Sequence, residues 1–313
     1  MATSGSVNFS ITRDEIITEA LELLGVLEPG TTAEPADVTT ASRSLNMLIK
    51  AWQADGLTLF SIKQSYLFTE KNKTIYTLSS SGDNYTYSYT KQTIDGAVAS
   101  GAATVDLTDA TDFVDNDNIG IYLDDGSMQW TTGTKVANTI TLGAVTTDTV
   151  ADDATVYFYT AKADAPDSII EASIRNDSLN ERPIDLFSRQ EYSELSNKTT
   201  DGNIVQAFFQ ERISEPYLHV WPQSSDPRDV LVCWIKRTRE DFDNFDDNPD
   251  FPQRWYFPLA YNLAVAIGPK FGTPSNNPNF KQVKEDAIIW YNKAQDYDSQ
   301  PEANVRFEVD MTP

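Results

Sequence analysis

Histidine and cysteine, which often act as catalytic bases and nucleophiles, each occur once in this 313-residue chain, as His219 and Cys233. A catalytic triad needs a nucleophile beside a base, and no G-x-S-x-G motif is present in the sequence. The alternation in "PYLHVWP" places His219 on a strand, which favours a structural histidine. Zinc sites built on His and Cys need several such ligands, and this chain does not supply them.

Carboxylates are abundant and leave oxygen-based chemistry to consider. The segment from Asp241 to Asp250, "DFDNFDDNPD", could hold Ca²⁺ through oxygen ligands, but it lacks the central Gly and final Glu of an EF-hand loop. Two carboxylates at the right separation can cleave a glycan. Because 47 Asp and Glu residues guarantee many chance pairs, no pair stands out. We therefore predict no catalytic, cofactor or metal site, and expect that the protein is not an enzyme.

Motifs for binding phosphate are incomplete. "GPKFGT" at 268–273 lacks the G-K-[ST] ending of a phosphate loop and follows a predicted helix. "KRTR" at 236–239 is followed at once by two acids, which favours an exposed strand end. The chain has 24 Lys and Arg residues against 47 acids, a net charge of −23. Such a chain repels nucleic-acid phosphates, so it would not read a DNA sequence but could line a channel past which DNA slides.

Four amphipathic helices are predicted, two near each end of the chain. The first opens with a capping box of Thr12 and Glu15. The second has an apolar stripe with alternating spacings of 3 and 4: Val38, Ala41, Leu45, Leu48 and Trp52. The third runs from Trp255 to Gly268, with Pro258 either kinking it or lying in its first turn. The fourth, after Pro278, places five apolar residues on one face: Phe280, Val283, Ala287, Trp290 and Ala294.

Strand patterns fill the middle of the chain. Residues 66–90 and the segments "SIIEASIR", "PYLHVWP" and "VLVCWIKR" have the alternation or apolar runs of strands. A Thr-, Ala-, Asp- and Gly-rich block at about residues 92–160 contains five short strand patterns, typical of a small β-barrel or sandwich. We predict an α+β fold. Residues 1–91 and 161–300 would form a discontinuous helical core with a small antiparallel sheet, and residues 92–160 an inserted all-β barrel or sandwich.

The last residues, 301–313, are predicted to form an extended tail. Val305, Phe307 and Val309 alternate with charged residues, the pattern of a strand that adds to a sheet edge. A frayed polar terminus is the alternative interpretation. At the other end, "MATSGSVNFS" lacks a basic region and an apolar core, so no secretory signal is predicted. The longest apolar stretch is too short to span a bilayer, and we expect a soluble protein made in the cytoplasm, without a membrane anchor.

Segments on both sides of the predicted insert resemble one protein family. Residues 11–60, "ITRDEIITEALELLGVLEPGTTAEPADVTTASRSLNMLIKAWQADGLTLF", resemble the N-terminal helical pair of the head-to-tail adaptors of short-tailed bacteriophages, also called tail accessory factors or packaged-DNA stabilisation proteins. Segments 182–202, 216–223 and 255–272 match later parts of that family in the same order. The insert separately resembles a small β module of phage virion proteins, through residues 100–132 and 154–160.

The resemblance implies a structural function. Members of the family form a twelve-fold ring below the portal protein, extend and close the DNA exit channel, and carry the platform for the tail nozzle and hub proteins. It implies a location at the head-tail junction of the virion, after assembly in the host cytoplasm, with genomic DNA passing through the lumen. Candidate contacts with the portal or tail are Val305, Phe307, Val309, Trp255 and Tyr256.

Two alternatives belong to other functional classes. The carboxylates could serve a cell-wall hydrolase carried in the virion. The insert could be a carbohydrate-binding module that uses Trp130 and Tyr122, although a small β module also needs aromatic residues for its own core.

Overall fold

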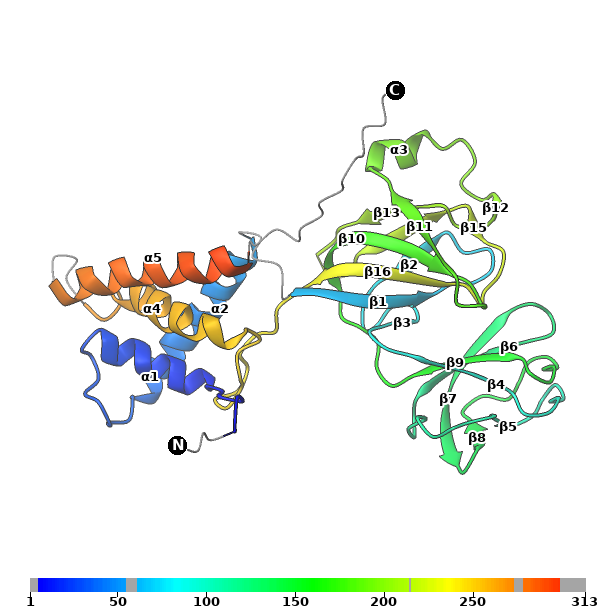
Figure 1. Cartoon of the computed structure of the whole chain (residues 1–313), viewed down its shortest axis with the longest axis horizontal. Coiled ribbons are helices and arrows are strands. Elements are labelled where there is room, and N and C mark those ends of the chain that lie inside the picture. The colour runs from blue at the N-terminus through cyan, green and yellow to red at the C-terminus, as the bar shows by residue number, and fades with distance from the viewer. Residues whose placement is uncertain (1–4, 55–60, 214, 273–277, 299–313) are drawn as a thin grey trace, which may run out of the picture. The chain divides into compact units, whose positions relative to one another are not determined.

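The computed structural model describes residues 5–54, 61–213, 215–272 and 278–298. The chain divides into two compact units (Figure 1). Met1–Ser61 together with Arg239–Pro313 form what we call the helical unit, and Ile62–Thr238 form the β unit. The predicted tail, residues 301–313, lies outside the described residues.

The helical unit holds the four predicted long helices. They are α1 (Arg13–Leu23), α2 (Pro35–Ala54), α4 (Tyr256–Ile267) and α5 (Pro278–Asp298), with a 3₁₀ turn, η2 (Gln253–Trp255), before α4. The capping box is confirmed, because the Thr12 side chain accepts the Glu15 N–H and the Glu15 carboxylate accepts the Thr12 N–H at 2.8 Å. Pro258 is the third residue of α4. The backbone N–H groups of the first turn of a helix have no partner within the helix, so a proline is tolerated there. Of the two predicted positions for Pro258, a kink or the first turn, the structure has the first turn.

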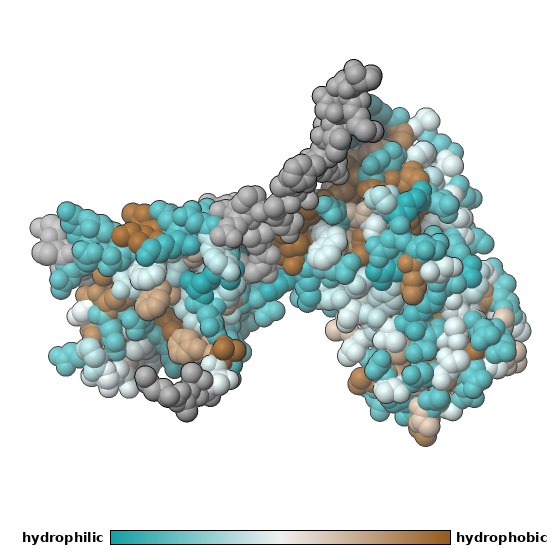
Figure 2. Space-filling view, in the orientation of Figure 1, coloured by the Kyte–Doolittle hydropathy of each residue, from teal (hydrophilic) through white to brown (hydrophobic). Residues whose placement is uncertain are grey.

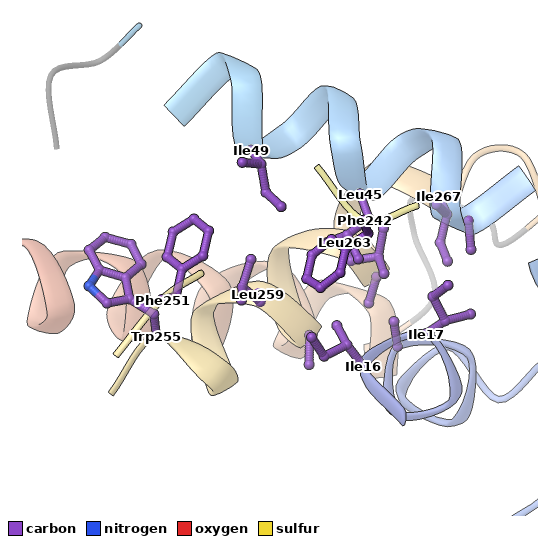
Figure 3. Close-up of a cluster of buried hydrophobic side chains, with 14 of the residues drawn as sticks. Ile16, Ile17, Leu45, Ile49, Phe242, Phe251, Trp255, Leu259, Leu263 and Ile267 are labelled. Atoms are coloured by element: carbon purple, nitrogen blue, oxygen red, sulfur yellow. The ribbon is translucent and has the colours of Figure 1, made fainter. Parts of the chain in front are cut away.

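One hydrophobic core lies between the helices (Figure 3). Leu259, Leu263 and Ile267 of α4 are fully buried against residues of α1 and α2. The acidic loop before η2 contributes Phe242 and Phe251 to the same core. Residues from the two ends of the sequence therefore share one apolar interior, and neither helical pair can bury its apolar stripe without the other.

An eight-stranded sheet forms the larger part of the β unit, in the order β2-β14-β13-β11-β10-β16-β1-β3. Its strands are β1 (Ile62–Phe68), β2 (Ile75–Thr77), β3 (Tyr85–Thr86), β10 (Pro166–Arg175), β11 (Glu181–Leu186), β13 (Gln206–Gln210), β14 (Tyr217–Trp221) and β16 (Val230–Arg237). Neighbours are antiparallel except β11 and β13, which are parallel. The short helix α3 (Arg189–Glu194) lies between β11 and β13 in sequence, and β12 (Asp201–Gly202) pairs with β15 (Gln223–Ser224).

The two faces of this sheet differ. Ser65, Cys233 and Ala172 are partners across β1, β16 and β10, and all three are buried on what we call the inner face. That face carries a core that also includes Leu67, Leu231 and other apolar residues. The next partners along the strands, Gln64, Trp234 and Glu171, point to the opposite or outer face because side chains alternate along a strand.

A six-stranded sheet is formed by the insert, in the order β4-β9-β6-β7-β8-β5. Its strands are β4 (Thr90–Thr93), β5 (Thr104–Asp106), β6 (Asn118–Tyr122), β7 (Met128–Val136), β8 (Thr139–Leu142) and β9 (Thr155–Tyr159). Gly126 has a φ of +79° in the tight turn between β6 and β7, a conformation that suits glycine. The sheet has its own core, which includes Phe113, Ile119, Ile140 and Phe158.

The predicted fold class is wrong. A helical core with a small sheet was expected, but the protein is mostly β, with sheets of eight, six and two strands. The prediction assigned the strand patterns outside the insert only to a small antiparallel sheet. The structure instead pairs β1 and β10 with the distant β16, and β11 and β13, which lack a clear alternating pattern, complete the sheet. The helices have a core of their own and do not form the centre of the fold.

Leu263 provides a test of the helical core. Replacing Leu263, which is fully buried, with Ala should lower the free energy of unfolding by about 2 to 5 kcal/mol, because it leaves a cavity. Urea unfolding followed by helical circular dichroism measures the change. Met47→Ala is the matched control, since Met47 on α2 is 65% exposed and should change the free energy by less than about 0.5 kcal/mol. Equal effects of the two substitutions would contradict the packing described.

Candidate functional site

Trp255, a predicted contact residue, is fully buried in the helical unit. Its ring packs 5.5 Å from that of Trp52, and its indole Nε1 donates to the Asp298 carboxylate at 2.8 Å. Arg254 Nε donates to the same carboxylate at 3.0 Å. These contacts join η2 to the end of α5; Trp255 and Asp298 are buried in them, whereas Arg254 is exposed. Of the other candidates, Val305, Phe307 and Val309 lie outside the described residues.

Tyr256, the remaining candidate, is half-buried at the start of α4, with its ring 6.0 Å from that of Phe9. Next to it, Phe257 is 55% exposed and stacks on Trp290 of α5, with ring centroids 5.2 Å apart and an interplanar angle of 17°. Tyr261, one turn further along α4, has its ring 6.2 Å from that of Phe257. We call Phe257, Tyr261 and Trp290 the α4–α5 aromatic surface.

The α4–α5 aromatic surface is the best candidate contact site in the helical unit. Ile288 and Ile289 of α5 are also exposed, at 61% and 47%. Figure 2 shows exposed apolar residues among polar ones on this unit. An exposed aromatic ring stacked on a half-buried one is an apolar feature of the kind found at protein-contact surfaces. The spacing of apolar residues predicts Trp290 on the apolar face of its helix, and it does not indicate Phe257 because Phe257 lies off the apolar stripe of α4.

The single histidine and cysteine are placed in packed surroundings. His219 is 9% exposed and stacks on Phe208, and one ring nitrogen is 2.9 Å from the Gln210 side-chain oxygen. Burial lowers the pKa of His219. Cys233 is completely buried on the inner face of the sheet, and burial raises the pKa of its thiol. Within the described residues, the ring contacts of His219 are with Tyr192, Phe208 and Tyr217, and none of them is with Cys233.

The acidic loop, residues 241–250, is stabilised by hydrogen bonds between its own backbone and the Asp247 side chain. The Asp247 carboxylate accepts the N–H groups of Asp243 and Asn244 at 2.8 and 2.6 Å. These hydrogen bonds lower the pKa of Asp247. Within the described parts of the chain, no group of three or more His, Cys, Asp or Glu side chains could hold a metal ion. No helix in those same parts is long and apolar enough to cross a membrane.

An aromatic cluster joins the inserted sheet to the eight-stranded sheet. Phe68 of β1 and Val230 of β16 are buried together with Tyr157 and Tyr159 of β9. The Phe68 ring lies 5.1 and 5.8 Å from the two tyrosine rings. We call this contact the junction. It covers one end of the outer face, which explains why β16 is buried on both faces from Val230 to Cys233.

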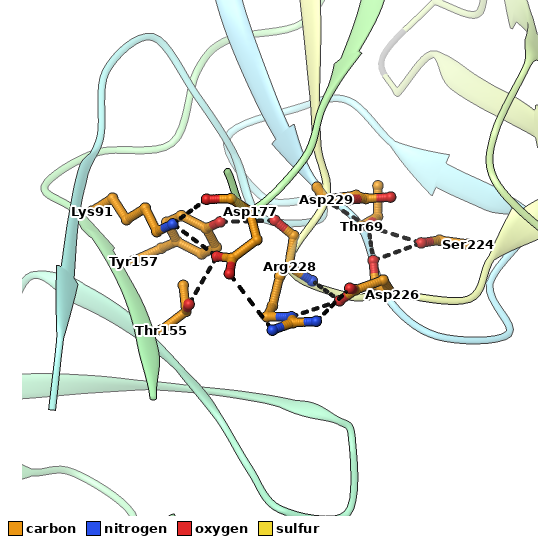
Figure 4. A network of polar contacts seen from close by, with 9 residues as sticks. All are labelled: Thr69, Lys91, Thr155, Tyr157, Asp177, Ser224, Asp226, Arg228 and Asp229. Atoms are coloured by element: carbon orange, nitrogen blue, oxygen red, sulfur yellow. Dashed lines mark hydrogen bonds and ion pairs between the residues drawn. The ribbon is translucent and has the colours of Figure 1, made fainter. Parts of the chain in front are cut away.

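A polar network continues the junction (Figure 4). Lys91 of β4 forms an ion pair with Asp177 at 2.8 Å, and Thr155 of β9 donates to the same carboxylate at 2.8 Å. Arg228 lies 3.5 Å from the second Asp177 oxygen, and the Tyr157 hydroxyl donates to the Arg228 carbonyl at 2.7 Å. Burial alone would raise the pKa of Asp177, but these donors lower it. The insert is thus attached by ionic and hydrogen bonds as well as by apolar contacts.

The two residues considered for carbohydrate binding are part of this junction. The Trp130 ring lies 4.8 Å from the Phe68 ring and packs against the aromatic cluster. The Tyr122 ring has the Arg228 guanidinium over it, 4.6 Å from the ring centroid. Both side chains therefore contribute to packing between the two sheets of the β unit.

Asp229, beside the network, gives a prediction with a defined pH dependence. Burial and the nearby negative charge of Asp226 raise its pKa to about 6. Because this value exceeds the ordinary pKa of about 3.9 in the unfolded chain, the folded state binds the proton more tightly. The stability of the β unit should therefore fall as pH rises from about 4 to about 6. Asp229→Asn should remove this penalty and stabilise the unit at pH 7 by about 1 kcal/mol, allowing for solvent screening.

Urea unfolding of the two proteins at pH 4 and pH 7 measures this effect. The gain should disappear at pH 4, where the wild-type carboxyl is already neutral. Asp226→Asn is the control, and it should lower the stability at pH 7 where Asp229→Asn raises it. The Asp226 carboxylate is paired with Arg228 at 2.7 Å, and its pKa is lowered. A gain for Asp229→Asn that is the same at both pH values would contradict the assignment.

No protein-family model matches the sequence, and no curated protein matches it. Among solved structures, the Gp54 tailspike of Acinetobacter baumannii bacteriophage AP22 is 17% identical, with a TM-score of 0.21, over 23% of this chain and 14% of the tailspike. VP17, a capsid protein of bacteriophage P23-77, is 10% identical, with a TM-score of 0.12, over 57% of this chain and 75% of VP17. One is a tailspike and the other a capsid protein of a bacteriophage, but at these TM-scores neither likeness establishes the fold or the function of this chain.

Proposed function

We propose that this protein is a structural component of a bacteriophage virion and, more specifically, a head-to-tail adaptor. In this proposal it forms a ring below the portal, extends and closes the DNA channel, and carries the platform for the tail. The proposal starts from the resemblance of four segments to the adaptor family, at residues 11–60, 182–202, 216–223 and 255–272.

The packing of the helical unit is the observation that carries the proposal. Described residues of two of the four segments, 11–60 and 255–272, pack against each other in one core. Ile16 and Ile17 of α1, and Leu259 and Leu263 of α4, are all fully buried there. The resemblance at the two ends of the sequence thus falls on one folded unit, as expected if the whole unit is related.

Two further features support a contact protein over an enzyme. In the α4–α5 aromatic surface Phe257 is 55% exposed and Tyr261 and Trp290 are half-buried, and a partner could cover the exposed parts of these rings. The net charge of −23 suits a channel past which DNA slides without sticking. We propose that the protein acts by shape and contact, without catalysis.

The α4–α5 aromatic surface should be needed for binding to the portal. The double variant Phe257→Ala, Trp290→Ala should weaken binding to the purified portal ring of the same phage at least tenfold, because exposed aromatic anchors often dominate contact energies. Sedimentation of portal–protein mixtures measures the binding. Met47→Ala, an exposed substitution on α2, is the control and should bind like wild type. Unchanged binding of the double variant would remove this surface from the contact.

The tail provides an independent test of the same proposal. Deleting residues 301–313 should weaken portal binding while leaving the far-ultraviolet circular dichroism of the remaining protein unchanged, because the tail is predicted to dock through backbone hydrogen bonds. The mass of the complex of wild-type protein and portal should show a high-order cyclic assembly. A protein that stays monomeric and never binds the portal would overturn the adaptor proposal; a monomer in the absence of portal would not, since some rings assemble only on their partner.

A further inference from the structure

The outer face of the eight-stranded sheet is covered by the inserted module at Phe68, and by Tyr192 of α3 at Phe208 and His219. Phe68 and Val230 lie under the junction and are 1% exposed. Further along β16 on the same face, Trp234 is 43% exposed. The structure therefore leaves a tryptophan uncovered in the middle of a sheet, just beyond the edge of the inserted module.

Acidic residues lie next to Trp234 on this face. Glu171 of β10 is its direct cross-strand partner. Continuing the β10–β11 register by one residue places Asp185 beside Glu171. Cross-strand neighbours on one face have Cβ atoms about 5 Å apart. An indole and two carboxylates thus form a row across β16, β10 and β11.

A shallow depression of about 410 Å³ includes this row. It is lined by Ile170, Glu171, Ala172, Ser173, Glu181, Pro183, Ile184, Asp185, Leu186 and Trp234. Three of these residues are acids and none is basic. Glu181 is paired with Arg175, whereas no ion pair to Glu171 or Asp185 occurs among the described residues. Lys236, the nearest cation along β16 on this face, does not line the depression.

The side chains that line this depression favour the binding of a cation. Trp234 offers an exposed aromatic face, and tryptophan is the best of the aromatic residues at attracting a cation. Elsewhere in the β unit several rings already hold a cation, such as Tyr217 under Arg212 at 4.3 Å. Within the described residues no cation lies over Trp234. Ile170, which is 39% exposed and lines the depression, adds apolar contact area.

We propose that the Trp234 depression binds an arginine side chain carried by a segment of a partner protein. The guanidinium stacks on the indole, and its N–H groups donate to the carboxylates of Glu171 and Asp185. Arginine is favoured over lysine because its planar fork can stack and donate at the same time. The apolar stem packs on Ile170. This proposal uses only the geometry of the β unit and does not depend on the adaptor function.

Fluorine NMR of the full chain labelled with 5-fluorotryptophan tests the proposal. The chain has six tryptophans, and Trp234→Phe identifies the Trp234 signal. The probes are acetyl-Gly-Arg-Gly-amide and the same peptide with citrulline, which has nearly the same shape but no charge. The Trp234 signal should shift in a saturable way with the arginine peptide and at least fivefold more weakly with citrulline. Trp290 is the internal reference, because its ring already has Lys293 over it at 4.4 Å.

Substitutions on the strands complete the test. Glu171→Gln and Asp185→Asn should each weaken arginine binding several-fold, and added salt should weaken it further. Gln64→Ala is the matched control: Gln64 is the partner of Trp234 on the other side and carries no charge. Both acids are exposed, so the variants should fold, and the other five tryptophan signals report on that. No shift with arginine, an equal shift with citrulline, or a larger shift with a neutral saccharide such as maltotriose would each overturn the proposal.

Discussion

The pairing of β16 with β1 and β10 is the constraint on which the rest of the structure depends. β16 lies between strands that come from either side of the inserted sheet in the sequence. At one end, Ile62 pairs with Lys236, directly next to the two points where the chain passes to the helical unit. At the other end, Phe68 pairs with Val230 under the junction. One antiparallel pair thus fixes where both chain connections leave the β unit and where the insert is attached.

The junction explains an otherwise unusual burial pattern. A strand of an antiparallel sheet with one face in water should alternate between buried and exposed residues. In β16 the run from Val230 to Cys233 is buried on both faces, and exposure begins at Trp234. The cause is the aromatic cover supplied by β9 and its neighbours in the insert. The apolar run "VLVCWI" therefore makes two different contacts, one with the core on the inner face of the sheet and one with the inserted module.

Local signals were predictable and long-range pairing was not. The capping box at Thr12, the buried stripes of α1 and α2, and the short strands of the insert follow from the spacing of neighbouring residues. The fold class was missed because sheet size depends on partners far apart in the sequence, such as Ser65 and Cys233. The capping box of α3, Ser188 with Glu191, was present in the sequence and could have been found. The exposure of Phe257 and Trp234 could not, because it depends on where packing partners stop.

The insert packs against the eight-stranded sheet as well as forming a sheet of its own. Its separate composition and its own core suggest a module that could be removed. Yet it covers Phe68 and Val230, and it supplies Lys91, Thr155 and Tyr157 to the polar network. Without it, the outer face would expose a continuous apolar surface from Phe68 to Trp234, of the kind that leads to non-specific association. The insert and the outer face are therefore adapted to each other, and Trp234 marks the part of that face left open to a partner.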